Sequence, residues 1–130
     1  KMNPTNIIEF KQDGAVVFRV QDKDGRGPWK PGFSHKWVED RPDHDNLPPW
    51  FVEFGRVDRL VLYGETCGCG CQTLDQLRRW FTKSEWWKLK KYGYRAVKIE
   101  IGRMLAQSDI QCVFGRVKPL NEDVETVELW

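Results

Sequence analysis

The sequence lacks any hydrophobic run long enough to cross a membrane. A spanning helix needs about 20 apolar residues, and no segment of the 130-residue chain approaches this length. Residues 1–10 also lack the apolar stretch that is typical of a signal peptide. We therefore expect a cytoplasmic protein that has no membrane partner.

Cysteine is too scarce for a disulfide framework. Cys67, Cys69 and Cys71 lie close together and Cys112 is distant, so we expect reduced thiols. Three alternating thiols would share one face of an extended strand and could bind zinc, but structural zinc sites normally use pairs of cysteines spaced C-x2-C. The spacing therefore does not favour zinc, and the alternative is that small residues here let a strand and a helix approach each other closely.

A large excess of charge of one sign is also missing, because the formal net charge is only +2. A dedicated nucleic-acid-binding domain is normally much more basic. The charges are nevertheless unevenly placed, since residues 74–91 contain six Lys or Arg against the acids Asp75 and Glu85. With Trp86 and Trp87, this segment could present a basic aromatic face to nucleic acid, or it could form an ordinary solvated helix surface.

What the sequence does contain is ample material for one hydrophobic core. Hydrophobic residues make up 40% of the chain and aromatic residues 13%, including seven tryptophans. A chain of this length buries about two-thirds of the surface that its unfolded form exposes. We therefore expect one domain spanning residues 1–130, with residues 1–14 as a flexible N-terminal segment.

The order of the expected elements predicts an α+β fold with a small, mainly antiparallel sheet and two short helices. Runs of β-branched and aromatic residues predict strands over residues 15–20, 57–63, 94–101, 110–114 and 124–130. Capping boxes that begin at Thr73 and Thr82 predict the two helices. The second helix should end at Gly93, where glycine suits the left-handed position that follows a helix.

A long loop, Gln21–Pro49, interrupts this order and contains five of the seven prolines. So long a loop inside a compact domain is normally an ordered functional segment or contains short elements. Three tryptophans could fix this loop to the core: Trp29, Trp37 and Trp50. His35 and His44 could form a metal or acid–base site with neighbouring aspartates, although a solvated turn is the simpler interpretation.

The most informative feature is a strand that carries Arg19 and runs into a glycine-bearing turn with a second arginine, Arg26. Such a segment can present bidentate side-chain donors and backbone N–H groups to a phosphate or carboxylate, as a nucleotide site requires. The alternative is that Arg19 pairs with a carboxylate across the sheet and that the Asp-Gly and Gly-Pro steps are only turns.

Four segments in this order give the chain a resemblance to small phage and prophage proteins and, more loosely, to compact ADP-ribosyltransferase-like domains. They are Phe18–Val20 with the Gly25–Pro28 loop, Gly70–Phe81, Leu89–Val97 and Ser108–Phe114. The resemblance covers most of the chain after Ala15 and rests on the spacing of these segments. It implies an ADP-ribosyltransferase-like fold that takes NAD as its cofactor.

The resemblance also assigns cofactor-binding roles to residues of this chain. In the superfamily an early strand carries a basic residue that contacts the phosphates or ribose of NAD, which implies this role for Arg19, with Gln21 and Arg26 beside it. A middle strand carries a Ser or Tyr motif, which implies a role for Tyr63 or Thr66.

The catalytic role is the point at which the chain departs from the family pattern. A late strand of the family carries a glutamate, whose carboxylate stabilises the positive charge that develops on the nicotinamide ribose. Asp109 or Gln111 occupies the matching position. Asp109 could supply the charge with a shorter reach, whereas Gln111 is neutral and could not.

Three hypotheses for the function follow. The first is an ADP-ribosyltransferase-like glycosyltransferase that binds NAD or a related nucleotide and modifies a host target in the host-cell cytoplasm. The second is a non-enzymatic phage-encoded inhibitor that binds a host or defence protein through an exposed patch around Trp37, Trp50 or Trp86. The third is a nucleic-acid-binding module that uses Arg78 and Arg79 on the basic helices. Whether the protein is an enzyme stays open at this point.

Overall fold

The computed structural model describes residues 7–11, 15–40 and 46–130. Its strands, with bounds in chain order, are β1 (Ile7–Lys11), β2 (Val16–Gln21), β3 (Thr66–Gly70), β4 (Arg95–Glu100), β5 (Arg103–Gln107), β6 (Cys112–Arg116) and β7 (Val124–Val127). Its helices are α1 (Trp50–Glu53), α2 (Leu74–Arg79), α3 (Lys83–Lys91) and the 3-10 helices Ser34–Lys36 and Val57–Leu60. The predicted α+β class is confirmed.

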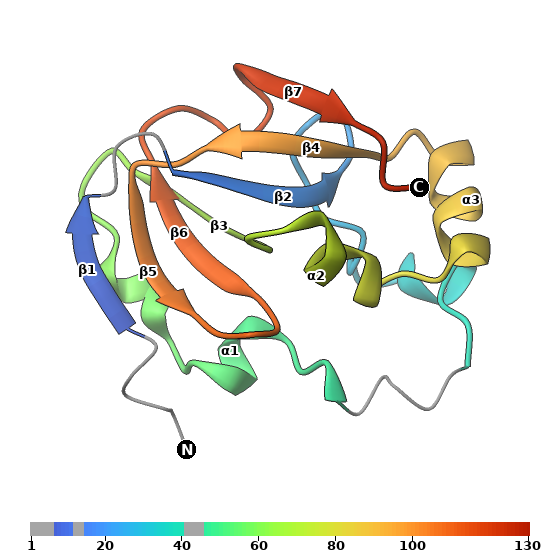
Figure 1. Ribbon diagram of the computed structural model, residues 1–130, viewed down its shortest axis with the longest axis horizontal. Coiled ribbons are helices and arrows are strands. Elements are labelled where there is room, and N and C mark those ends of the chain that lie inside the picture. Colours follow the sequence, from blue (N-terminus) through green and yellow to red (C-terminus); the bar gives the residue numbers. More distant parts are fainter. Residues whose placement is uncertain (1–6, 12–14, 41–45) are drawn as a thin grey trace.

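The strands of the described residues form two antiparallel sheets. One has the order β1-β5-β6-β3 and the other the order β2-β4-β7. Figure 1 shows β2, β4 and β7 along the top of the molecule, with β1, β5 and β6 below them. The two sheets meet at one bridge between Phe18 on β2 and Cys71 just after β3, whose backbone N–H···O distances are 2.7 and 2.8 Å.

This junction depends on the alternation of glycine and cysteine in β3. A Cβ atom on Gly70 would lie 2.7 Å from the backbone oxygen of Phe18, and one on Gly68 would lie 2.6 Å from the ring of Phe114. Both distances are far below ordinary van der Waals contact, so only glycine allows β2 and β6 to approach β3 this closely. The small residues therefore permit close packing, as expected, but between strands rather than between a strand and a helix.

The two predicted helices are confirmed, and both capping boxes are formed. The side chains of Thr73 and Thr82 each accept a hydrogen bond from a backbone N–H of the first turn, and the side chains of Gln76 and Glu85 accept one from the backbone N–H of the capping residue. Gly93 follows α3 with a φ of 88°, the left-handed conformation that glycine adopts without strain.

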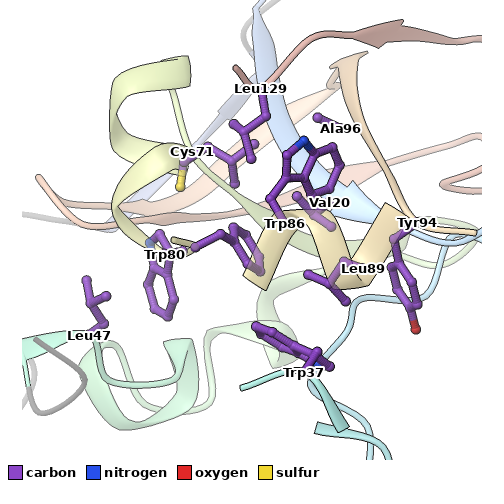
Figure 2. Close-up of a cluster of buried hydrophobic side chains, with 12 residues drawn as sticks. Val20, Trp37, Leu47, Cys71, Trp80, Trp86, Leu89, Tyr94, Ala96 and Leu129 are labelled. Atoms are coloured by element: carbon purple, nitrogen blue, oxygen red, sulfur yellow. The ribbon is translucent and has the colours of Figure 1, made fainter. Parts of the chain in front are cut away.

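The largest hydrophobic cluster lies between the helices and the β2-β4-β7 sheet. Figure 2 shows Trp86 and Leu89 of α3 among side chains of this sheet, with Trp80 and Trp37 beside them. Two smaller clusters fill the rest of the interior, one between the two sheets around Phe114 and one under α1 around Phe54. Helix packing against one face of a sheet is the arrangement expected of an α+β domain.

The loop after β2 is ordered where it is described, and Trp37 fixes it to the core as predicted. The Trp37 side chain is fully buried, and its Nε1–H donates to the carbonyl of Pro28 at 3.1 Å. The loop also docks on α3, because the backbone N–H of Glu39 donates to Glu85 at 2.8 Å. Residues 41–45, which include His44, lie outside the described residues, as do 1–6 and 12–14 of the predicted N-terminal segment.

One strand prediction is wrong. Residues 57–60 form a 3-10 helix, and the chain after it is irregular up to β3. The physical reason is that Val57 and Leu60, three residues apart, both turn toward the cluster around Phe54 and Leu105, which a strand would not permit. Strands β1, β3 and β5 were not predicted. No helix in the described part of the chain has the length and hydrophobicity that crossing a bilayer requires.

Candidate functional site

A cavity of about 890 Å³ opens where β2, β3 and the loop after β2 meet. We call it the Arg19 pocket. Its lining combines basic residues, large aromatic residues and the glycine–cysteine strand; the members used below are Arg19, Arg26, Lys30, Trp29, Trp50, Phe51, Trp80, Phe81, Asp58, Gln111 and residues 67–71. A volume of this size falls in the range of sites for small organic ligands.

Arg19 is a buried cation with no carboxylate partner among the described residues. Its side chain is 7% exposed, and its Nη1 and Nη2 groups donate to the carbonyls of Cys69 and Gly25 at 2.9 and 3.1 Å. The Nε–H is buried without a hydrogen-bond partner. A guanidinium has five N–H donors, so most of the hydrogen-bonding capacity of Arg19 is unused. The alternative in which Arg19 pairs across the sheet is not what the structure has.

The position of Arg19 is set by the two glycines of β3. A Cβ atom on Gly68 would lie 3.2 Å from Nη1 of Arg19, and one on Gly70 would lie 3.5 Å from its Cβ. The guanidinium therefore lies directly against the backbone of β3, where the Cys69 carbonyl orients it. Two fixed carbonyl contacts hold the group in one place without neutralising its charge.

Aromatic side chains form one wall of the pocket. Trp29 is 48% exposed and makes an edge contact with buried Trp37 at 4.6 Å between ring centroids. It also lies 6.4 Å from both Trp80 and Phe81. A partly exposed ring that is held by its neighbours offers a rigid surface on which a planar ligand group can stack.

The remaining charges of the pocket are largely committed to partners. Lys30 pairs with Asp22 at 3.4 Å, and Asp58 forms a two-point ion pair with Arg56 at 2.7 and 3.0 Å. Both carboxyl groups have a pKa below their usual range: hydrogen bonds from Arg56 lower that of Asp58, and backbone and Lys30 contacts outweigh the effect of burial on Asp22. The charges within the Lys30–Asp22 pair and within the Arg56–Asp58 pair thus cancel, and the excess charge of the pocket is that of Arg19 and exposed Arg26.

Gln111 lines the same pocket, immediately before β6. Its Nε2 group donates to the carbonyl of Pro48 at 2.8 Å and to Glu53 at 2.9 Å. These bonds tie α1, which carries the lining residues Trp50 and Phe51, to the sheet. Of the two candidates for the catalytic role, Gln111 is therefore the one that shares a cavity with Arg19, and it also holds one rim of that cavity.

The structure places the other predicted site residues away from the pocket. Asp109 is exposed in the turn between β5 and β6, where its carbonyl accepts a bond from Gln76. Tyr63 is fully exposed, and Thr66 begins β3 directly before the lining residue Cys67 but does not itself line the cavity. Buried Gln21 donates to the carbonyl of Leu120 and shares a face of β2 with Arg19 without lining the cavity.

Sequence reasoning missed the part of the pocket that α1 supplies. Trp50 and Phe51 join the site through the Gln111 contacts, which link positions far apart in the chain. The available signal was the concentration of proline and tryptophan near residue 50, which marks an ordered rather than a disordered loop.

Three thiols of this region, those of Cys67, Cys71 and Cys112, have a raised pKa. Burial raises the pKa of Cys67 to about 11 and that of Cys71 to about 12, and it raises the pKa of buried Cys112 well above its usual value. Among the described residues, no group of three or more His, Cys, Asp or Glu side chains could hold a metal ion.

Two of the three tryptophans named for an inhibitor patch are themselves buried, although Trp87, beside Trp86, is 63% exposed. Trp37 and Trp86 are buried, which leaves Trp50, half-buried at the pocket, as the remaining member of that prediction. Part of the basic helix face is also engaged by partners within the protein. Arg78 donates to the carbonyl of Leu129 at 2.6 Å and pairs with Asp75 at 2.6 Å.

Comparison with known proteins identifies a phage family. No curated protein and no solved structure has significant similarity to the chain. The sequence model of the family described as "Bacteriophage T4 Y00F protein" matches residues 6–128. This match confirms the predicted resemblance to small phage proteins, whereas the likeness to ADP-ribosyltransferase-like domains stays a prediction. Because the match spans nearly the whole chain, the protein belongs to the family of the bacteriophage T4 Y00F protein.

Proposed function

We propose that this phage protein binds NAD or a related nucleotide in the Arg19 pocket. The observation that carries the proposal is the state of Arg19, a buried guanidinium that faces a large cavity, has no carboxylate partner among the described residues and keeps most of its donors unused. A buried, uncompensated charge is costly unless an opposite charge joins it. A phosphate or pyrophosphate is the anion that a forked guanidinium binds best.

The composition of the pocket supports a nucleotide over a simple inorganic anion. Exposed Arg26 lies at the rim and can supply a second positive charge. The ring of Trp29 can stack on a base or on nicotinamide. A ligand with two phosphates and planar end groups would use both features, whereas inorganic phosphate would use only the arginines.

The arrangement of strands brings two of the proposed ligand-facing residues together. Strand β3 lies between their elements: β2 meets β3 at the Phe18–Cys71 bridge, and β3 pairs with β6 along its length. Arg19 on β2 and Gln111, immediately before β6, consequently line one cavity.

A second candidate function is binding without ADP-ribosyl transfer, for which Gln111 is the specific observation. Its amide is neutral, and both of its N–H groups are engaged by Pro48 and Glu53. The one carboxylate among the described lining residues, Asp58, is paired with Arg56. Transfer would need an anion close to the nicotinamide ribose, and exposed Asp109 lies outside the pocket.

Calorimetric titration with NAD, ADP-ribose and ADP tests the proposal. Arg19→Met removes the donors and keeps the apolar stem, and it should weaken binding about tenfold or more, since hydrogen bonds to charged groups contribute roughly 1.5–3 kcal/mol. Arg95→Met is the matched control, because Arg95 is exposed on β4 and does not line the pocket. Arg26→Ala, at the exposed rim, gives a second reading if Arg19→Met does not fold.

Absence of binding at millimolar concentrations of all three ligands would refute the proposal, as would equal affinity in the Arg19 and Arg95 variants. Incubation of labelled NAD with host lysate then separates the two candidates. Labelled host protein that disappears in Arg19→Met would support transfer, and intact NAD binding without labelling would support binding alone.

A further inference from the structure

A second hollow, of about 430 Å³, lies between α3 and the segment that follows β7. We call it the α3 groove. Its lining residues are Lys83, Ser84, Trp86, Trp87, Lys90 and Trp130. Figure 1 shows the end of the chain after β7 beside α3. The groove shares no lining residue with the Arg19 pocket.

The lysines of the groove are not engaged by acidic partners within the described residues. Lys83 and Lys90, together with Lys91 beside the groove on α3, are exposed and have no ion pair there. On the same helix, Lys88 is paired with Glu39 at 3.2 Å. The positive charge of α3 is therefore available on the side that faces the groove.

Two tryptophans expose their rings at the same place. Trp87 is 63% exposed and Trp130 is 41% exposed, whereas Trp86 is buried and fixes α3 to the core. The ammonium groups of Lys90 and Lys91 lie 5.8 and 5.9 Å from the ring centroid of Trp87. Exposing so large an apolar ring costs free energy in water, and the adjacent cations make its environment strongly positive.

We propose that the α3 groove binds single-stranded nucleic acid, with lysines on the phosphates and a base stacked on Trp87. An exposed tryptophan ring flanked by lysines fits this ligand, because every nucleotide of a single strand offers an unpaired base for stacking and a phosphate for the lysines. A duplex keeps its bases stacked inside, so it would leave Trp87 unused. An acidic peptide would satisfy the lysines but would not require the ring.

Fluorescence anisotropy of a labelled oligothymidylate of about 12 nucleotides tests the proposal with the whole protein. Three lysine–phosphate contacts predict that affinity falls roughly 20-fold between about 50 and 200 mM salt, since the slope for single strands is about −0.7 per contact. Trp87→Ala should weaken binding about tenfold or more, because base stacking on an aromatic side chain is worth about that factor. Lys90→Ala combined with Lys91→Ala should lower both the affinity and the salt dependence.

Matched controls are available on other surfaces. Tyr63→Ala removes a fully exposed ring, and Lys23→Ala combined with Lys36→Ala removes two exposed lysines outside the groove. These variants should bind as the unmodified protein does. Three results would each overturn the proposal: no binding of the oligonucleotide at micromolar protein, unchanged affinity in Trp87→Ala, or equal competition by polyglutamate and by unlabelled oligonucleotide. The last result would instead identify an acidic protein partner.

Discussion

Replacing Gly70 with alanine should destabilise the protein by an amount that the geometry of the sheet junction sets. The new Cβ would lie 2.7 Å from the backbone oxygen of Phe18, where ordinary contact begins at about 3.4 Å. The nearest atoms are the backbone of Phe18 and the Cβ of Arg19, which are not flexible side-chain ends, so β2 and β3 must move apart. Their separation weakens the two hydrogen bonds of the Phe18–Cys71 bridge, which are 2.7 and 2.8 Å long.

Overpacking costs about 1–3 kcal/mol, and the two weakened hydrogen bonds cost about 1 kcal/mol each. Alanine also lowers the entropy of the unfolded chain, which returns about 0.4–1 kcal/mol. The expected loss in the free energy of unfolding is thus about 2–4 kcal/mol. For a chain of this size it corresponds to a fall in Tm of about 10 °C.

Urea denaturation followed by tryptophan fluorescence measures this loss, with Gly27→Ala as the control. Gly27 has no positive φ, and a Cβ there would meet its nearest atom, Nη2 of Arg19, at 3.8 Å, which is ordinary contact. Gly27→Ala should therefore be neutral or slightly stabilising. The reasoning fails if Gly70→Ala changes the free energy of unfolding by less than about 0.5 kcal/mol, or if both variants are equally destabilised.

Three further outcomes are expected. Hydrogen bonds from Arg103 at 2.8 and 3.0 Å lower the pKa of Glu65, so its contribution is full above the unfolded pKa of about 4.3 and is lost as pH falls through the folded value. Glu65→Gln should lower the free energy of unfolding by about 2–3 kcal/mol at neutral pH. Urea unfolding measured across pH should also show that this free energy falls less steeply toward acid pH in the variant. Thr73→Ala should cost about 1 kcal/mol through loss of the α2 cap, seen in the same assay at pH 7. Trp37→Ala should lower the free energy of unfolding by about 3–5 kcal/mol, and Trp37→Phe should lower it much less. If the loop only rested on the surface, thermal unfolding would show little change in either variant.

Elements whose causes are local could be predicted from the sequence. The capping boxes at Thr73 and Thr82 act within four residues, and Gly93 acts at a single position, so both helices could be identified without knowing the fold. The strand after Gly14 was equally clear from its β-branched residues. In each case the neighbours in sequence are also the neighbours in space.

Strand β3 could not be predicted in this way. Its sequence, Thr-Cys-Gly-Cys-Gly, has low strand propensity, and it is extended because β6 pairs along its whole length and β2 meets its end. The strand prediction for Val57–Leu60 was wrong for the opposite reason. The apolar residues of this segment suit a strand, but Val57 and Leu60 both pack in the cluster at Phe54, and residues three apart share one face only in a helical turn. Tertiary packing overrode local preference at both positions.

The residues of the site also differ in whether local sequence could predict them. Arg19 could be identified because its strand and the following turn are contiguous in sequence. The contribution of Trp50 depends on the bonds from Gln111 to Pro48 and Glu53, which close a loop of about sixty residues. No local pattern encodes such a contact, and one sequence gives no information on paired positions.

The Phe18–Cys71 bridge has a consequence for cooperativity. Within the described residues it is the one backbone bridge that pairs the two sheets. A ligand that contacted Arg19 on β2 and Gln111 beside β6 together would add to the connections between them, which include the hydrogen bond from Arg19 to the Cys69 carbonyl. Such a ligand would stabilise both sheets together, so they would unfold as one unit. Proteolysis at the junction would slow in proportion to ligand occupancy.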